Sequence, residues 1–361
     1  MSFPRKVLEH FRLRSGSRQQ ASSQAYSPSQ GIVHDDERML SISGTYPRLA
    51  RLHDGSILAG YTRREGNLRI LEISKSHDSG QTFAKIGEVT RSHGDTDNLF
   101  LLEVAPGTVL AAFRNHDLGP GGYTYFRITV CRSQDGGRSW HYLSQAAEKR
   151  APLGLWEPFM RMGQEGEVQM TFSQEFAHDD QRTMMVVSYD QGTSWTKPRC
   201  IEGANNRLRD GMTGIAETFD QILRKPVLVM VFETTRYGPF NIEAVLSYDD
   251  GKTWGYRQEV YNPPRGHNAG APQICSFGDG SMAVAFMTDD QSRQVRWYQN
   301  AAIRVVFSTA PVNGQLQWSK PAQVSPASSF WPGILTLDHR TALATYDRNG
   351  PKAKSLSWPG P

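Results

Sequence analysis

Residues 247–254 read SYDDGKTW, directly after the apolar run 242–246. The same pattern (Ser, any residue, Asp, any residue, Gly, any residue, Thr or Ser, aromatic residue) recurs as SHDSGQTF at 76–83, SQDGGRSW at 133–140 and SYDQGTSW at 188–195. These four copies start 57, 55 and 59 residues apart, and a degenerate fifth copy covers 307–318. A repeat of this period predicts a propeller or a similar repeated architecture.

The chemistry of the repeated octapeptide suits a tight β-turn. Its Asp can accept hydrogen bonds from backbone amides further along, its Gly can take a positive φ, and its Thr or Ser adds another bond. The closing aromatic residue can anchor the outgoing strand. A Ca²⁺ loop is the alternative, but the copies contain too few carboxylates for a closed oxygen cage. We therefore interpret these repeats, called Asp boxes below, as scaffold turns, and expect neither a metal nor a cofactor.

Pairs of apolar segments joined by tight turns lie between the Asp boxes. Their apolar residues run almost continuously, as expected when both faces of a strand are buried between neighbouring sheets. Six pairs predict an all-β fold, a six-bladed β-propeller that occupies residues 31–361 as a single domain. We expect 33–43 to add an outer strand that ties the last blade to the first, because an open ring would leave backbone groups unpaired. The pairs are 47–52 with 56–62, 99–104 with 108–113, 159–162 with 167–172, 213–219 with 227–232, 272–277 with 281–287, and 334–337 with 342–346.

The net charge of +4 resides in the first 30 residues, which contain five Lys and Arg residues and one Glu. The remainder is neutral overall and gives no support for nucleic-acid binding. We expect 1–30, rich in Ser, Gln and Arg, to be a disordered tail. It lacks the apolar run of a secretory leader, so we expect an intracellular protein or one whose leader is missing. No segment has membrane-spanning length, and we expect a monomer.

The three Cys residues show no ligand spacing. Cys131, Cys200 and Cys275 are an odd number, so we expect buried free thiols and not a disulfide framework.

One face of the predicted propeller collects polar side chains. The first strand of each blade lies nearest the axis, so first-strand starts and second-strand ends open on the same face, called the mouth below. The Asp boxes, between third and fourth strands, belong on the opposite side. The mouth is expected to receive Arg48, Asp95 to Asn98, Glu157, Asp210, Asn268 and Trp331 from the first strands, and Arg63, Arg114, Glu175, Glu233, Asp289 and Tyr346 from the second.

Two carboxylates that flank one bond are the minimum for glycoside hydrolysis. Glu157, in LWEPF, begins the third blade, and Glu233, in VFETT, ends the second strand of the fourth. Neighbouring blades can bring such groups within the roughly 5–5.5 Å used by retaining enzymes. A Glu at a strand end can equally face solvent or pair with an Arg, and Glu175 is a carboxylate in reserve.

Aromatic and polar residues around this pair are the candidate sugar contacts. Trp156, Trp331 and Tyr346 can offer flat apolar surfaces, although the two Trp residues can also pack between blades. We predict that the substrate contacts are Arg48, Asp97, Asn98, Arg114, Trp156, Glu175, Asp210, Asn268, Trp331 and Tyr346.

The Asp boxes resemble those of sialidases and related propeller hydrolases. Over roughly residues 42–350 the chain also resembles glycoside hydrolase family 93, the fungal exo-arabinanases. The segments that carry this resemblance are YPRLARLHDGS (46–56), GLWEPF (154–159), RDGMTGIA (209–216), VFETT (231–235) and HNAGAPQI (267–274).

The family resemblance implies a specific reaction. It implies that α-1,5-linked L-arabinan is cleaved from its non-reducing end, with release of arabinobiose and retention of configuration. A glutamate pair would do the chemistry, and we place it on Glu157 as acid/base and Glu233 as nucleophile. Members of the family are normally secreted, and a chain without a visible leader departs from that pattern.

Two other functions fit parts of the same sequence. A non-catalytic carbohydrate-binding propeller would keep the aromatic residues and lose a carboxylate, whereas both Glu positions are filled here. A sialidase would need three arginines around a carboxylate, a Tyr nucleophile and an Asp acid, but Tyr46-Pro47-Arg48 stands where Arg-Ile-Pro is usual. The residues available for it are Arg48, Arg114, Arg265 and Tyr346, with Asp95 or Asp97 as the acid.

Overall fold

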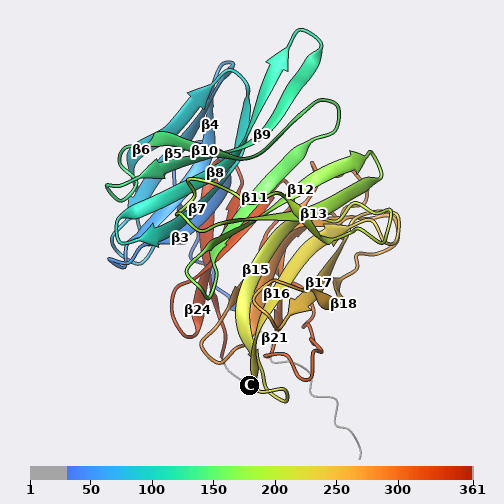
Figure 1. Cartoon of the computed structure of the whole chain (residues 1–361). Helices are drawn as coiled ribbons and strands as arrows, with labels where there is room; N and C mark the ends of the chain where they lie inside the picture. Colours follow the sequence, from blue (N-terminus) through green and yellow to red (C-terminus); the bar gives the residue numbers. More distant parts are fainter. Residues whose placement is uncertain (1–30, 360–361) are drawn as a thin grey trace, which may run out of the picture.

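A computed structural model of the chain describes residues 31–359, which form 25 β-strands and no helix (Figure 1). The predicted disordered tail, 1–30, lies outside the described residues. The strands form six antiparallel sheets, so the predicted six-bladed propeller is confirmed. The first three blades are β3 (Thr45–Arg51), β4 (Ile57–Glu65), β5 (Leu68–Ser76) and β6 (Ala84–Ser92); β7 (Asp95–Ala105), β8 (Thr108–Gly119), β9 (Gly122–Ser133) and β10 (His141–Arg150); and β11 (Leu155–Met162), β12 (Val168–Ala177), β13 (Asp180–Ser188) and β14 (Arg199–Glu202).

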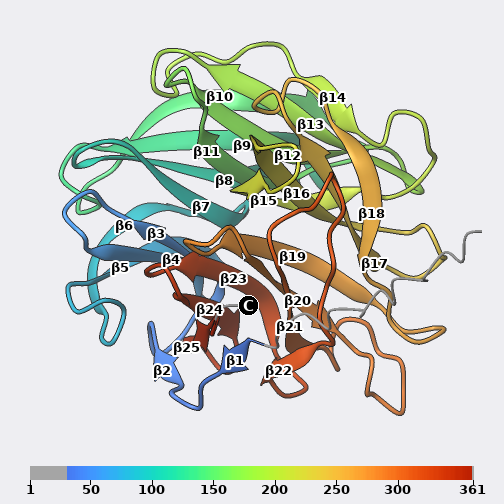
Figure 2. The same cartoon turned by 90° about the horizontal axis from the view of Figure 1, so that it is seen from below.

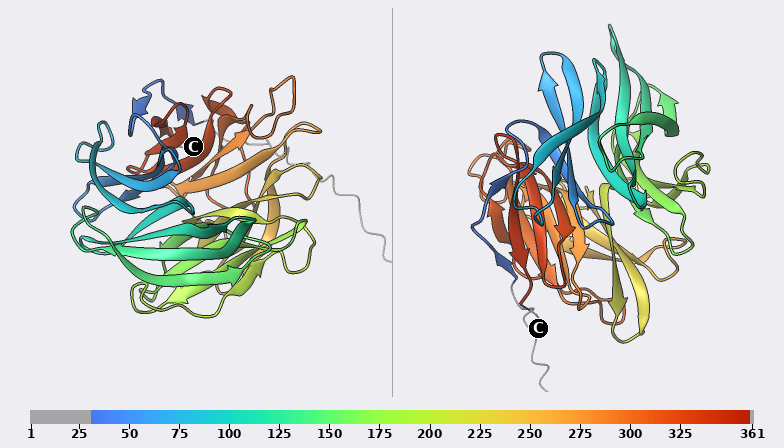
Figure 3. Two further views of the ribbon diagram at one scale, coloured as in Figure 1. Left: turned by 90° about the horizontal axis from the view of Figure 1, so that it is seen from above. Right: turned by 90° about the vertical axis from the view of Figure 1, so that its left-hand side faces the viewer.

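The remaining three blades complete the ring. The first strands of neighbouring blades contact each other all the way round, so that β3, β7, β11, β15, β19 and β23 surround the axis (Figures 2 and 3). These blades are β15 (Gly211–Asp220), β16 (Lys225–Thr234), β17 (Asn241–Ser247) and β18 (Gly255–Tyr261); β19 (Ala269–Ser276), β20 (Met282–Thr288), β21 (Ala302–Ser308) and β22 (Ala322–Ser325); and β23 (Phe330–Thr336), β24 (Thr341–Asp347) and β25 (Pro351–Ser357), joined by β1 (Ile32–Val33) and β2 (Arg38–Met39).

The N-terminal strands close the ring, as predicted for residues 33–43. The expected outer strand is split into two short pieces, because both β1 and β2 pair with β25. Between them, the Glu37 carboxylate accepts a hydrogen bond from the Tyr346 hydroxyl at 2.6 Å and pairs with Lys352 at 2.6 Å. The sixth blade is therefore assembled from both ends of the chain.

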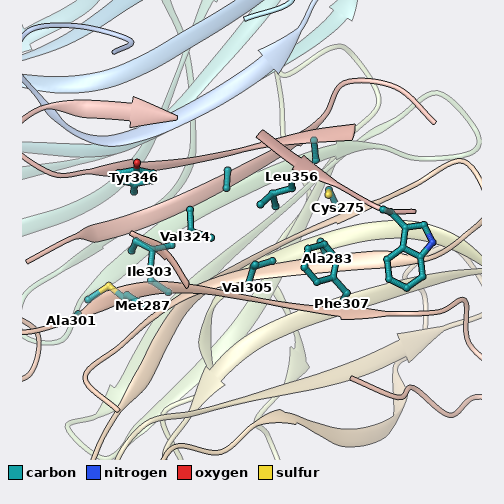
Figure 4. Close-up of a cluster of buried hydrophobic side chains, with 14 of the residues drawn as sticks. Cys275, Ala283, Met287, Ala301, Ile303, Val305, Phe307, Val324, Tyr346 and Leu356 are labelled. Carbon is teal, nitrogen blue, oxygen red and sulfur yellow. The ribbon is translucent and has the colours of Figure 1, made fainter. Parts of the chain in front are cut away.

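Apolar side chains fill the space between the fifth and sixth blades. Ile303, Val305 and Phe307 of β21 pack with Val324 and Leu356, and all five are buried. Figure 4 shows this cluster, with the Tyr346 ring toward one end of it. Cys275 is buried in the same cluster and Cys131 in another, whereas Cys200 is half-buried; all three thiols are free.

The Asp boxes form turns between third and fourth strands, opposite the mouth, as predicted. In the first box the Asp78 carboxylate accepts hydrogen bonds from the backbone N–H of Gln81 at 3.0 Å and of Thr82 at 2.9 Å. The Ser76 hydroxyl accepts one from the Gly80 N–H at 2.8 Å and donates to Asp78. Three of these bonds recur in the other three complete boxes: Ser hydroxyl to Asp, Gly N–H to Ser hydroxyl, and the N–H four residues after Asp to its carboxylate. Because these carboxylate oxygens are occupied by protein donors, the boxes act as scaffold.

Every first strand begins with a β-bulge that the sequence analysis did not anticipate. At each one the register with the second strand shifts, and one residue takes a left-handed φ between 43° and 56°. A bulge bends the strand and re-aims the side chain next to it. The first strands consequently start two to four residues earlier than predicted, and the extra residues reach the mouth. The left-handed residues are Tyr46, Asn98, Glu157, Met212, Ala271 and Trp331.

Candidate active site

The two predicted catalytic carboxylates lie in the mouth on neighbouring blades. Glu157 is the bulge residue of β11, and Glu233 is the penultimate residue of β16, where it pairs with Gly211 of β15. Glu157 is half-buried and Glu233 is 9% exposed. Both groups lie near strand ends, as the sequence predicted, and Glu157 is close enough to Glu233 for the charge of Glu233 to raise its pKa.

A backbone amide and a glycine position the Glu233 carboxylate. The Ala271 N–H donates a hydrogen bond to Glu233 Oε2 at 2.8 Å. This N–H comes from the bulge of β19, one blade further round. A Cβ atom at Gly270 would lie only 2.5 Å from the same oxygen, so glycine leaves the space that the carboxylate occupies.

Both carboxyl groups hold protons more tightly than an exposed glutamate does. Burial, and after it the nearby charge of Glu233, raise the pKa of Glu157 to about 8, while Arg114 and Arg209 act to lower it. Burial also raises the pKa of Glu233 to about 7, while the Ala271 N–H and Arg209 act to lower it. The two environments thus separate the pair: Glu157 is the group that stays protonated to higher pH, and Glu233 is the more readily ionised group.

Arg209 is a functional candidate that the sequence analysis missed. Its guanidinium donates to Glu175 Oε1 at 2.9 Å, to Gln181 Oε1 at 2.8 Å and to the His178 carbonyl at 2.7 Å. From there its positive charge affects both catalytic carboxyls. Arg209 directly precedes Asp210 at a first-strand start, in the RDGMTGIA segment. The sequence therefore indicated its place near the mouth but not its contact with Glu175.

Glu175, the reserve carboxylate, is held as an ionised partner. Besides Arg209, the Gly154 N–H donates to Glu175 Oε2 at 2.8 Å. Burial acts to raise the pKa of Glu175, but these two donors outweigh it and the pKa lies below its ordinary value. A carboxylate engaged by two donors is suited to positioning Arg209 and not to proton transfer.

Asp95, Asp97 and Arg114 form a charged network beside Glu157. Arg114 contacts Asp95 Oδ1 at 3.1 Å and Asp97 Oδ2 at 3.4 Å, and Arg69 also pairs with Asp95. The Tyr123 hydroxyl donates to Asp95 Oδ2 at 2.5 Å. Burial opposes ionisation of Asp95, yet Arg114, Tyr123 and Arg69 hold its pKa below the ordinary value.

Arg48 and three aromatic rings form the opposite wall of the mouth. The Tyr46 and Trp331 ring centroids are 5.9 Å apart, and the Trp331 and Tyr298 centroids are 5.5 Å apart. The Arg48 guanidinium lies 4.1 Å from the centre of the Tyr46 ring and donates to the Trp331 carbonyl at 3.2 Å. Tyr46 and Tyr298 were not predicted; Tyr46 stands two residues before Arg48, whereas Tyr298 lies in a loop without any repeated pattern.

Trp156 and Asn98 reach the mouth but also serve the packing around it. The Trp156 ring lies against His116, with centroids 5.3 Å apart, and below the Arg114 guanidinium at 5.4 Å. The packing explanation weighed for Trp156 therefore finds support, and its role as a sugar surface stays a prediction. Asn98 is the bulge residue of β7, and its N–H donates to Asp97 Oδ1 at 2.9 Å.

Three other predicted contacts are occupied within the protein. Asp210 is 0% exposed and pairs with Arg257 at 2.7 Å. Asn268 accepts a hydrogen bond from the Phe240 N–H at 3.1 Å and ties two loops together. Tyr346 is 0% exposed, so its ring does not face the mouth as expected; it packs in the core because its hydroxyl reaches Glu37 of the closing segment.

The residues considered for a sialidase do not form a free arginine clamp. Arg114 is already paired with two carboxylates, Arg48 is almost fully buried, and Arg265 is exposed on the loop between β18 and β19. Tyr346, the proposed nucleophile, is buried. In residues 31–359 there is also no group of three or more His, Cys, Asp or Glu side chains suited to hold a metal, and no helix long and apolar enough to cross a membrane.

Comparison with solved structures identifies proteins of the same architecture. A Penicillium chrysogenum α-L-arabinanase in complex with arabinobiose matches with a TM-score of 0.66 and 18% identity, over 91% of this chain and 97% of that one. A family 93 α-L-arabinofuranosidase of Fusarium graminearum, also with arabinobiose, matches with a TM-score of 0.68 and 19% identity, over 92% and 98%. The chain shares their fold.

A more distant match has the same general architecture. The NanB sialidase of Streptococcus pneumoniae matches with a TM-score of 0.57 and 14% identity, over 95% of this chain and 72% of that one. No protein-family model and no curated protein matches the sequence.

Proposed function

We propose that this chain is a retaining, exo-acting glycoside hydrolase that cleaves α-1,5-linked L-arabinan from its non-reducing end and releases arabinobiose. The observation that carries the proposal is the pair Glu157 and Glu233, a half-buried and a buried carboxyl on neighbouring blades whose pKa values are both raised and differ in the order the reaction needs. The sugar is inferred from the shared fold with proteins solved with arabinobiose and from the five family-93-like segments.

In the first step, Glu157 acts as the acid. Its raised pKa keeps it protonated near neutral pH, so it can protonate the leaving oxygen as the glycosidic bond breaks. The Glu233 carboxylate attacks the anomeric carbon and forms the covalent glycosyl-enzyme. The Ala271 N–H holds the Glu233 oxygen in place, and Arg209 favours its ionised form.

In the second step, Glu157 acts as the base. After the leaving sugar departs, Glu157 is ionised and takes a proton from water, which attacks the anomeric carbon and releases Glu233. Once Glu233 is esterified it no longer carries the charge that raised the pKa of Glu157. The same pair therefore supports both halves of a retaining reaction, and two inversions give net retention.

The test replaces each glutamate and supplies azide. Glu233→Ala removes the nucleophile, so azide should restore turnover and yield a glycosyl azide of inverted configuration. Glu157→Ala should be least impaired on aryl arabinosides whose leaving group needs no protonation, and azide should then give a product of retained configuration. Glu165→Ala is the control, because this exposed carboxylate lies in the turn between β11 and β12, opposite the mouth.

Three outcomes would contradict the assignment. Exchanged product configurations would reverse the two roles. Near-normal arabinan hydrolysis by both variants would move the chemistry away from this pair. Arabinan binding by a wild-type protein that never turns it over would leave the carbohydrate-binding propeller as the better description.

A further inference from the structure

Arg257 is a largely buried cation that contacts the chain neighbours of Glu233. It lies in β18, the outer strand of the fourth blade, and its side chain is 15% exposed. The guanidinium lies 4.9 Å from the centre of the Phe232 ring, and its Nη2 atom donates a hydrogen bond to Thr234 Oγ1 at 3.1 Å. Phe232 and Thr234 are the residues on either side of Glu233 in β16. Arg257 therefore holds the end of this strand on both sides of the proposed nucleophile.

The same guanidinium also holds the residue that follows Arg209. Arg257 donates to the two oxygens of the Asp210 carboxylate at 2.7 and 3.2 Å. Asp210 is 0% exposed and lies directly before β15. The Arg209 N–H in turn donates to Thr235 Oγ1 at 3.0 Å, which ties the start of β15 to the end of β16. One side chain thus joins the segment that carries Arg209 to the segment that carries the nucleophile.

Two further carboxylates hold Arg257 in place. Its Nε atom donates to Glu243 of β17, which also pairs with Arg236, and its Nη1 atom donates to Glu202 of the third blade at 2.9 Å. Burial acts to lower the pKa of Arg257, but Asp210 and Glu243 outweigh it and hold the pKa above its ordinary value. A guanidinium presents five N–H donors in a rigid fork, whereas the lysine ammonium is a compact charge on a flexible stem. The cluster therefore depends on the shape of arginine as well as on its charge.

The place of Arg209 matters for the charge that acts on the nucleophile. Glu157 of β11 and Arg209 both interact with the Glu233 carboxyl through their charges, and β19 contributes the Ala271 N–H. Of these, Arg209 and the N–H favour the ionised form of Glu233. Because a charge interaction weakens with distance, an Arg209 held less firmly would leave Glu233 less ionised at a given pH.

We infer that Arg257 is a positioning residue for the proposed reaction: through Thr234 and Asp210 it keeps Glu233 and Arg209 in a fixed relation. This inference rests on the proposed function. It also gives Asp210, predicted as a substrate contact, a different role as the partner of Arg257. A cluster that served stability alone would affect the melting temperature and leave the protonation of Glu233 unchanged.

The experiment replaces Arg257 by lysine, which keeps a positive charge beside Asp210 but cannot make all the hydrogen bonds. The substrate is the 4-nitrophenyl glycoside of α-1,5-arabinobiose. A displacement of about 1 Å at a reacting atom can cost on the order of 100-fold in rate, so a looser hold should lower kcat/KM about tenfold. The acid limb of its pH profile should move up by about half a unit. Thr234→Val replaces the hydroxyl next to Glu233 by a methyl group of similar size and should move the limb in the same direction by less.

Arg161→Lys is the matched control for these variants. The Arg161 side chain is 12% exposed and joins the same two blades, because it pairs with Asp250 at 2.8 Å in an Asp box opposite the mouth. It should lose thermal stability as Arg257→Lys does, with its acid limb at the wild-type position.

A second measurement needs no substrate and so separates this inference from the proposed function. In protein labelled with ¹³C at the glutamate carboxyl carbons, NMR follows the protonation of Glu233, whose signal Glu233→Gln identifies. The midpoint should lie near 7 in wild type and about half a unit higher in Arg257→Lys. If wild type hydrolyses no arabinoside but this midpoint still rises, the proposed function fails and the positioning role stands. A midpoint that stays or falls in Arg257→Lys, or rises equally in Arg161→Lys, would overturn the inference. If Arg257→Lys does not fold, the midpoint in Thr234→Val decides by the same criterion.

Discussion

Replacing Gly270 by alanine would test how the protein positions its nucleophile. Gly270 does not have a left-handed φ, so the backbone accepts an alanine. The new Cβ would lie 2.5 Å from Glu233 Oε2 and 3.1 Å from the Trp297 ring. Because the closest atom is the free end of a side chain, the carboxylate has to move and the strand does not. We expect the free energy of unfolding to change by less than about 1 kcal/mol, since alanine also restricts the unfolded chain.

The catalytic cost follows from the contact that is displaced. Moving Oε2 breaks its hydrogen bond with the Ala271 N–H, which is 2.8 Å long. A hydrogen bond to a charged group contributes roughly 1.5–3 kcal/mol, and a displacement of about 1 Å at a reacting atom can cost on the order of 100-fold in rate. We therefore expect Gly270→Ala to lower kcat/KM about 100-fold on an aryl arabinofuranoside, equivalent to about 2.7 kcal/mol of activation free energy.

The measurement pairs kinetics with thermal melting, and Gly255→Ala serves as the control. Gly255 lies in β18 of the fourth blade, has no left-handed φ and has no atom near the position of its would-be Cβ. It should keep full activity. Wild-type kcat/KM in Gly270→Ala would refute the reasoning about Glu233. A large fall in melting temperature would show that the glycine is needed for folding and not for positioning.

Three further expectations concern ionisation and ring closure. The pH profile of kcat should be bell-shaped, with the acid limb from ionisation of Glu233 near pH 7 and the basic limb from loss of the Glu157 proton near pH 8. A basic limb that persists in Glu157→Gln on an activated aryl substrate would contradict this assignment. Because the pKa of Glu157 is raised in the folded protein, the unfolded chain releases that proton at lower pH, so wild-type stability should fall as pH rises from about 4.5 to about 8. Glu157→Gln should therefore melt at a higher temperature than wild type at pH 8 but not at pH 4. Melting temperatures of the two proteins that run parallel across this pH range would contradict the expectation. Deleting residues 1–44 removes β1, β2 and Glu37 and should abolish cooperative melting, whereas deleting 1–30 should leave it unchanged; equal melting temperatures would show that these strands do not close the ring.

Local sequence was sufficient to predict the repeated architecture. The Asp boxes depend on contacts within a few residues, such as those between Ser76, Asp78, Gly80 and Thr82, so their recurrence reveals the blades directly. The paired apolar segments show burial on both faces without knowledge of their neighbours. Glu157 and Glu233 could be predicted at the mouth because strand order in a propeller determines which strand ends share a face.

Tertiary structure decided how the side chains of the mouth are arranged. The bulge at Glu157 depends on the register of β11 against β12, which no local pattern encodes. Arg209 matters because it faces carboxyls on two blades, and Tyr346 is buried because its hydroxyl meets Glu37, 309 residues away in the chain. Local sequence therefore determined the order of the strands and the Asp-box turns between them, while the starts of the first strands depend on bulges against their partners. The raised pKa values of Glu157 and Glu233 depend on burial and on charges that only the folded ring brings together.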